Sequence, residues 1–285
     1  MLSSKVVFVT GAARGIGEHT ARLAAARGAT VVLAGLEPER LATVAAETGG
    51  VSFECDVTDQ AALDRAAATT VERYGRIDAV VANAGIAPRG TIAVGDIDAM
   101  AHTVEVNLIG AMRTVRATVD HVIASRGYYL LVSSAAAFAG LPGMAAYSAS
   151  KAGLEQFGNA IRLELRHRGV AVGTAHMSFI DTDLVRDVAD DLPQFRQTLR
   201  RLPWPMGTVT SVEACARAFV DAIERRRRKV YVPRAIGAVH AFRSLMSSPL
   251  TDAVIGRGAR TAVPRMEEQV RALGRAFGAS GGGER

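Results

Sequence analysis

Short runs of apolar residues alternate along the chain with longer segments in which apolar residues recur at helical spacing. The short runs are rich in Val, Ile and Leu without an alternation of apolar and polar positions, which is typical of strands covered on both faces. They lie at 5–10, 29–34, 51–55, 77–82, 128–133, 170–176 and 229–232. The helical segments lie near 15–27, 37–48, 59–73, 98–126, 147–168 and 211–226, with Asp59 and Ser211 as expected N-caps. This order predicts an α/β fold, with a doubly wound, seven-stranded parallel sheet and helices on both faces.

Two segments depart from this alternation. Residues 177–210 form a long connection that contains Pro193, Pro203 and Pro205, and long connections at the ends of strands often cover a ligand. Beyond the last strand we expect a helical C-terminal extension, 233–285, attached to a catalytic domain, 1–232. Within it the pattern predicts helices near 236–246, 250–259 and 264–277, and a disordered Gly/Ser-rich end at 278–285.

Charge is concentrated in the C-terminal part of the chain. Of 34 basic and 28 acidic residues, 13 basic and 4 acidic ones fall in 225–285. The basic residues alternate with apolar ones, a pattern that suits helices on an anionic membrane or helices that cover the protein's own substrate opening. Our hypothesis is that residues 234–277 pack over the loop at 184–206, and that any membrane contact is peripheral.

Composition and targeting signals indicate an ordinary globular chain. Apolar residues make up 49% of the 285 residues and charged residues 22%, which excludes disorder over most of the length. Two cysteines, Cys55 and Cys215, suit core packing in a reducing compartment. The chain begins almost at once with the first strand, so we expect a cytoplasmic protein. The six histidines show no metal-ligand spacing, and we expect no metal and no nucleic acid partner.

The first strand leads into a glycine-rich turn and then directly into a helix. Gly11, Gly15 and Gly17 let the backbone turn tightly and approach a pyrophosphate, while the helix N-terminus favours an anion. A structural turn would explain three glycines alone about as well. Their place between the first strand and the first helix of a βαβ unit favours dinucleotide binding.

The spacing Thr10-Gly11-x-x-x-Gly15-Ile16-Gly17 resembles the fingerprint of the single-domain branch of the short-chain dehydrogenase/reductase family. Asp56-Val57 after the third strand and Asn83-Ala84-Gly85 after the fourth are similar to the family's motifs at those places. The resemblance covers about residues 5–232 and implies a Rossmann-like fold. It implies that these residues, together with Arg14, bind a nicotinamide dinucleotide.

Tyr147 and Lys151 are four residues apart on a predicted helix and so share one face. An ammonium beside a phenol lowers the phenol's pKa from about 10 and lets it exchange protons near neutral pH. An exposed pair without function is the alternative. However, the chain has 31 arginines and only three lysines, Lys5, Lys151 and Lys229, which favours a specific need for an ammonium at 151.

The family resemblance assigns the roles. It implies Tyr147 as proton donor and acceptor, Ser134 as the residue that orients the carbonyl, and Lys151 as partner of Tyr147 and binder of the nicotinamide ribose. It adds Asn107, which positions a water in the proton relay. It also implies that Ile180 and Thr182 meet the nicotinamide carboxamide, although Met177-Ser178 replaces the family's Pro-Gly just before them.

The choice between the two nicotinamide cofactors depends on the end of the second strand. Gly35 stands where an acidic residue would bind the ribose hydroxyls of NAD, and Arg14 and Arg40 could attract a 2′-phosphate. Glu37 is only two positions away and argues the other way. The sequence therefore favours NADP(H) over NAD(H) without excluding NAD(H).

Apolar residues before Tyr147 and in the long loop indicate a lipophilic alcohol or ketone, such as a steroid, polyketide or fatty-acyl compound. The candidate substrate contacts are Phe138, Met144, Met177, Phe179 and Trp204, with Leu184 and Phe195 also in the loop. The alternative is that several of them only pack the loop. We expect an oxidoreductase acting on CH–OH groups; the other hypothesis is a catalytically silent nucleotide-binding scaffold or sensor, which would predict a broken Ser–Tyr–Lys set. The resemblance also implies a homodimer or homotetramer.

Overall fold

A computed structural model describes residues 2–88, 90–183, 185, 186, 199, 202, 204–246 and 248–273. The predicted loop contacts Leu184 and Phe195, and the Gly/Ser-rich end at 278–285, lie outside the described residues.

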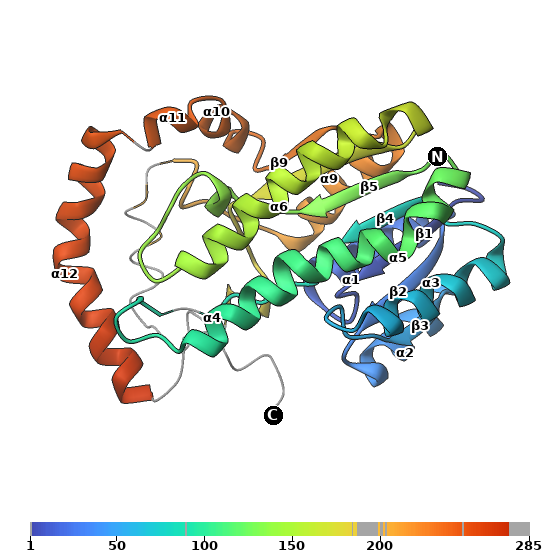
Figure 1. Ribbon diagram of the computed structural model, residues 1–285, viewed down its shortest axis with the longest axis horizontal. Coiled ribbons are helices and arrows are strands. Elements are labelled where there is room, and N and C mark those ends of the chain that lie inside the picture. Colours follow the sequence, from blue (N-terminus) through green and yellow to red (C-terminus); the bar gives the residue numbers. More distant parts are fainter. Residues whose placement is uncertain are drawn as a thin grey trace.

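The core of the protein is a seven-stranded sheet in which every neighbouring pair of strands is parallel (Figure 1). Its strand order is β3-β2-β1-β4-β5-β6-β9. The strands are β1 (Val6–Thr10), β2 (Thr30–Gly35), β3 (Val51–Glu54), β4 (Ala79–Ala82), β5 (Tyr128–Val132), β6 (Ala171–Met177) and β9 (Lys229–Val232). Each predicted strand is confirmed. Because the order reverses between β1 and β4, the carboxyl ends of these strands form the crevice in which such sheets bind ligands.

Helices cover both faces of the sheet, as the continuous apolar runs predict. One core cluster joins odd-numbered residues of β1, such as Val7, to Leu41 and Phe219, and the other joins the even-numbered residues, such as Phe8, to Leu63 and Leu154. The first face carries α1 (Gly15–Ala26), α2 (Pro38–Thr48) and α9 (Val212–Arg225). The second carries α3 (Gln60–Tyr74), α5 (Gly110–Ala124) and α6 (Ala145–Glu164).

Local sequence signals account for several element boundaries. Asp59 accepts hydrogen bonds from the backbone N–H groups of Ala61 and Ala62, and Ser211 accepts one from Ala214, so both predicted N-caps are confirmed. Cys55 and Cys215 are buried and unbridged, as expected. Short 3₁₀-helices η2 (Ala135–Ala137) and η3 (Arg166–Arg168) follow β5 and α6.

The helix predicted at 98–126 is not continuous. It consists of α4 (Ile97–Val104), a π-helical turn η1 (Glu105–Ile109) and α5. Asn107 lies in the π-turn, where its side chain bonds the backbone of a neighbouring loop. Such turns are frequent at functional sites.

The long connection after β6 contains a second, small parallel sheet of β7 (Phe179–Ile180) and β8 (Val209–Thr210), which the sequence pattern did not predict. Ser178 helps to fix its path, since its N–H donates to Val232 O (2.9 Å) and its hydroxyl to Met206 O (2.5 Å). Ser178 therefore ties the two sides of the connection together in place of the family's glycine.

The C-terminal extension contains α10 (Ile236–Ala241), α11 (Arg243–Met246) and α12 (Pro249–Leu273). The prediction of separate helices at 250–259 and 264–277 is wrong, because α12 continues through Pro264. Tertiary contacts beyond that proline offset its lost hydrogen bond: Met266 packs against Gly143, and Thr91 donates a hydrogen bond to Glu267 (2.9 Å). The second half of α12 is thereby held against the loops that precede α4 and α6.

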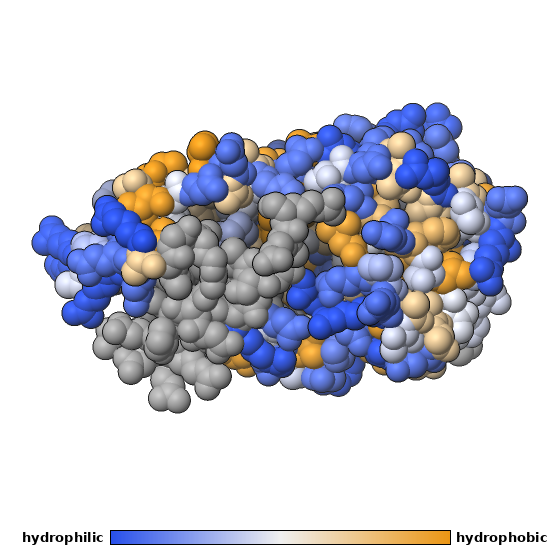
Figure 2. All heavy atoms as spheres, turned by 90° about the horizontal axis from the view of Figure 1, so that it is seen from below, coloured by the Kyte–Doolittle hydropathy of each residue, from blue (hydrophilic) through white to orange (hydrophobic). Residues whose placement is uncertain are grey.

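Figure 1 shows α12 as a long helix across the end of the molecule toward which the strands point. Its outward side chains include Arg257, Arg260, Arg265 and Arg271, and this end is dominated by hydrophilic side chains in Figure 2. Within the described part of the chain, no helix is both long and apolar enough to span a membrane.

Candidate active site

The turn between β1 and α1 is packed so closely against the turn after β4 that it needs glycine. Gly11 and Gly15 have φ values of +63° and +58°, which favour glycine. A Cβ on Gly11 would lie 2.8 Å from Ala84 Cα, and one on Gly17 would overlap the Gly11 carbonyl oxygen. Asn83 locks the two turns together, because its Nδ2 donates to the carbonyl oxygens of Thr10 (3.0 Å) and Gly11 (3.1 Å).

The residues at this turn fit a dinucleotide. Arg14 is the N-cap of α1, and the N–H groups of a helix's first turn favour an anion. The segment after β6 returns to the same place, since Thr182 Cγ2 lies 3.5 Å from where a Gly15 Cβ would be. Ile180 is buried and its carbonyl accepts from Thr182 Oγ1 (3.3 Å). The predicted pyrophosphate and carboxamide ligands therefore lie around one turn.

At the end of β2 the backbone leaves room for a larger residue. A Cβ on Gly35 would lie at ordinary contact distances, 3.6 Å from Leu41 and 3.7 Å from the backbone nitrogen of Ala12. Nearby, Glu37 lies 3.0 Å from Arg14 Nε and 3.3 Å from Arg40 Nε. Glu37, which favours NAD(H), thus forms one ion-pair cluster with Arg14 and Arg40, which favour NADP(H). Asp56, after β3, accepts from the N–H of Thr58 (2.8 Å) and shapes the next turn.

Tyr147 and Lys151 lie in the first two turns of α6, on one face. Lys151 Nζ lies 5.6 Å from the centroid of the Tyr147 ring and donates to Val132 O (2.9 Å) at the end of β5. Lys151 is only 4% exposed, and this burial lowers its pKa to about 8. The ammonium is therefore costly to hold in the fold, as is typical of functional sites.

Asn107 connects the π-turn to the loop after β4. Its Nδ2 donates to Ile86 O (2.9 Å) and Ser150 Oγ (3.2 Å), and its Oδ1 accepts from Ile86 N (2.8 Å). A Cβ on Gly85 would lie 3.0 Å from Asn107 Oδ1 and 3.4 Å from Lys151 Nζ. The side chains of Asn107 and Lys151 therefore meet at Gly85, and Lys151 connects this point to the Tyr147 ring.

Ser134 begins the turn after β5. Its Oγ accepts from Ala136 N (3.2 Å) and lies 3.5 Å from Met177 O. The preceding Ser133 is buried and donates instead to the Lys151 carbonyl (2.8 Å). Ser134 follows the end of β5, and Tyr147 and Lys151 lie at the start of α6. One β5–α6 unit therefore carries all three residues.

A family model described as short chain dehydrogenase matches residues 5–193. The chain belongs to this family. The family and the oxidoreductase class predicted from the sequence are confirmed.

Two similar proteins and one solved structure illustrate the family to which the chain belongs. An uncharacterized oxidoreductase of Myxococcus xanthus is 32% identical over 263 residues, which cover 90% of this chain and 98% of that protein. A mitochondrial borneol dehydrogenase of Lavandula x intermedia is 31% identical over 189 residues, 65% of this chain and 73% of that protein. A solved short chain dehydrogenase from Mycobacterium paratuberculosis, bound to NAD, superposes with a TM-score of 0.71 at 25% identity and covers 81% of this chain and 96% of its own.

The candidate substrate contacts of this short chain dehydrogenase occupy different environments. Met144 and Met177 are buried, and Phe179 packs against Leu199. Phe138 is part of a small cluster with Met206, Ile236 and Ala139. Trp204 is 79% exposed, so it remains only a prediction as a contact.

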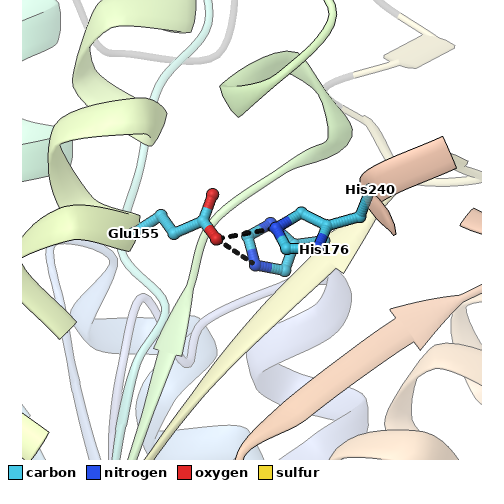
Figure 3. A group of neighbouring side chains, drawn as sticks. All are labelled: Glu155, His176 and His240. Atoms are coloured by element: carbon cyan, nitrogen blue, oxygen red, sulfur yellow. Dashed lines mark hydrogen bonds and ion pairs between the residues drawn. The ribbon is translucent and has the colours of Figure 1, made fainter. Parts of the chain in front are cut away.

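The sequence reading missed a polar cluster behind Ser134. The Glu155 carboxylate lies within hydrogen-bond or ion-pair reach of His240 and His176, and the possible ligand atoms of all three residues lie within 4.8 Å of one another (Figure 3). His176 and His240 are 64 residues apart in the sequence, so their spacing gave no indication of this cluster. One signal was present: Glu155 is four residues beyond Lys151, on the helix face that carries Tyr147.

Proposed function

We propose that this protein is a nicotinamide-dependent oxidoreductase that interconverts a secondary alcohol and a ketone, with Tyr147 as general acid and base. The observation that carries the proposal is the buried Lys151 ammonium beside the Tyr147 ring, at 5.6 Å, in a helix that follows the Ser134 turn. A bound nicotinamide supplies or accepts the hydride at the substrate carbon.

The chain's own residues would orient the substrate oxygen and transfer the proton to and from it. Tyr147 takes the hydroxyl proton when the alcohol is oxidised and returns a proton to the oxygen when the ketone is reduced. Ser134 donates a hydrogen bond to the same oxygen and fixes its direction. Lys151 stabilises negative charge on Tyr147 and binds the nicotinamide ribose, and Asn107 holds the neighbouring backbone for a proton relay.

We propose NADP(H) as the preferred cofactor. The support is the lack of an acid at Gly35 and the presence of Arg14 and Arg40, for which a 2′-phosphate would compete with Glu37. The NAD-bound relative shows that the family also accommodates NAD. Titration of the protein with NADPH and with NADH tests the preference directly.

We propose a neutral, lipophilic substrate. The turn that leads to Tyr147 carries Phe138 and the buried Met144, and the side chains across from it include Met206 and the partly buried Val239 of α10. A relative named for borneol, a neutral bicyclic secondary alcohol, agrees with this chemistry. Turnover of borneol, compared with the anionic 4-hydroxycyclohexanecarboxylate, is the test, and we expect the neutral alcohol to be preferred.

We further propose that the C-terminal extension forms a wall of the substrate opening. The contacts of Met266 with Gly143 and of Glu267 with Thr91 support this, as does the packing of Ile236 against Met206. Contact with anionic membranes through the outward arginines would be peripheral. A cytoplasmic location and a homodimer or homotetramer remain predictions, and light scattering at micromolar concentration tests the oligomeric state.

A further inference from the structure

A single buried carboxylate, that of Glu155, lies close to His176 and His240, as Figure 3 shows, and also to Lys229. Its Oε1 lies 2.8 Å from His240 Nε2 in α10, 2.7 Å from Lys229 Nζ at the start of β9, and 3.7 Å from His176 Nε2 at the end of β6. Glu155 is 5% exposed and His176 is fully buried. The cluster thus connects the helix of Tyr147 and Lys151 to the C-terminal extension.

Hydrogen-bond directions assign the proton positions in this cluster. Burial favours a neutral carboxyl, but the hydrogen bonds from Lys229 and His240 lower the pKa of Glu155 to about 2, so it is a carboxylate. His240 therefore donates from Nε2 to Glu155, and its Nδ1 lies 3.1 Å from the Tyr231 hydroxyl. Burial lowers the pKa of His176 to about 4, so its ring is neutral at pH 7.

The His176 ring bonds directly to the main chain of Ser134. Its Nδ1 lies 3.3 Å from Ser134 O, an oxygen that can only accept, so the neutral ring carries its proton on Nδ1. Its Nε2 then accepts from the Thr174 hydroxyl (3.3 Å). Phe138 packs against both imidazoles, with ring centroids 5.6 Å from His176 and 5.0 Å from His240. Ser134, Thr174 and Phe138 together thus fix the orientation of the His176 ring.

Two histidines and a carboxylate are also a common metal-binding set. Here the Lys229 ammonium already lies against the shared carboxylate oxygen, and Arg243 Nη1 lies 3.6 Å from it. A divalent cation would have to displace the Lys229 ammonium and overcome electrostatic repulsion from both Lys229 and Arg243. The cluster is electrostatically complete with Lys229 as the counter-ion.

We propose that His176 and Glu155 are positioning residues for Ser134, and that His240 links the C-terminal extension to them. The Nδ1–H of His176 fixes the carbonyl of Ser134 and with it the turn from which the Ser134 hydroxyl reaches the substrate. Glu155 anchors the surrounding side chains on the helix of Tyr147. This proposal rests on the proposed function, because it assumes that the Ser134 hydroxyl contacts the substrate oxygen.

A double-mutant cycle on the full-length protein tests the link between His176 and Ser134. His176→Phe keeps a ring of similar size and removes the bond to Ser134 O. We expect kcat for borneol oxidation to fall about tenfold, with KM and the NADPH dissociation constant unchanged. His176→Asn carries an amide N–H near the Nδ1 position and should restore kcat to within about threefold of the wild-type value. In a Ser134→Ala background, His176→Phe should change kcat by less than about twofold, because the two residues act as a unit.

An equal loss in both backgrounds, or no rescue by His176→Asn, would overturn the proposal. Thermal unfolding and NADPH binding of each variant distinguish misfolding from misplacement. The proposed function fails separately, if Ser134→Ala or Tyr147→Phe leaves borneol turnover intact.

His240 provides a second test that leaves the sheet untouched. His240→Gln retains a donor toward Glu155, whereas His240→Phe retains only the ring. We expect His240→Phe to lower kcat severalfold and His240→Gln to remain near the wild type. Equal kcat for the two variants would remove His240 from the link. A loss of wild-type turnover on chelation that added Zn²⁺ reverses would instead show a metal site and overturn the assignment of Lys229 as counter-ion.

Discussion

We expect replacement of the buried Lys151 to have two effects. It should increase the stability of the protein and abolish its activity. A pKa of about 8 for Lys151, against an ordinary 10.5, corresponds to roughly 3 kcal/mol of destabilisation at pH 7. Lys151→Met removes this cost and keeps the apolar stem. It also leaves Val132 O without the Nζ donor, which costs about 1 kcal/mol. We therefore expect a net gain of about 2 kcal/mol in the free energy of unfolding at pH 7, or a rise in Tm of roughly 4–8 °C.

The pH dependence of this gain identifies its cause. The folded-state pKa of Lys151 is lowered, so the cost is fully present below pH 8 and disappears as the pH rises from 8 toward 10.5. Urea unfolding at pH 7 and at pH 10 should show a large difference between Lys151→Met and wild type at pH 7 and a much smaller one at pH 10. Lys151→Arg is the matched control that keeps the charge, and we expect it to be inactive without the stability gain. A Lys151→Met protein less stable than wild type at pH 7, or a gain independent of pH, would refute the reasoning.

Three further predictions concern the cofactor, the C-terminal extension and pH. Gly35→Asp should weaken NADPH binding far more than NADH binding by repelling the 2′-phosphate, and Glu37→Gln should strengthen NADPH binding; fluorescence titration measures both, and tighter NADH binding by the unmodified protein would contradict the assignment. Met266→Lys should raise KM for borneol severalfold with cofactor affinity unchanged, whereas the exposed control Arg265→Gln should not. If deletion of residues 234–285 leaves the KM for borneol unchanged but abolishes sedimentation with anionic vesicles, the extension serves the membrane instead. In the direction of ketone reduction, kcat/KM should fall as the pH rises through about 8, where Lys151 loses its charge; a flat profile up to pH 10 would remove that ammonium from the reaction.

The strands that are covered on both faces could be predicted from the sequence. Continuous apolar runs such as those of β1 and β5 are typical of strands buried between two layers of helices. The Gly11–Gly17 turn and the Tyr147–Lys151 pair could be found because their members are close in sequence. The small sheet of β7 and β8 could not, since its strands are two residues long and are held by Ser178 across the loop. The continuity of α12 depends on contacts of Met266 and Glu267 with distant loops, which outweigh the local effect of Pro264.

In the site, too, the contacts that could not be predicted join residues that are far apart in the sequence. Glu155 meets His176, Lys229 and His240 only because α6, β6, β9 and α10 converge, and no spacing in the sequence encodes that meeting. The ion pairs of Glu37 with Arg14 and Arg40 likewise join residues that the sequence treated as opposing signals.

The central claim, that Tyr147 transfers the proton, is tested most directly by Tyr147→Phe, which removes only the phenolic oxygen. Turnover of borneol with NADP⁺ is measured together with NADPH affinity by fluorescence titration. The account predicts a loss of roughly a thousandfold or more in kcat, with the NADPH dissociation constant changed by less than about threefold. A Tyr147→Phe protein that keeps more than about a tenth of the wild-type kcat would contradict it.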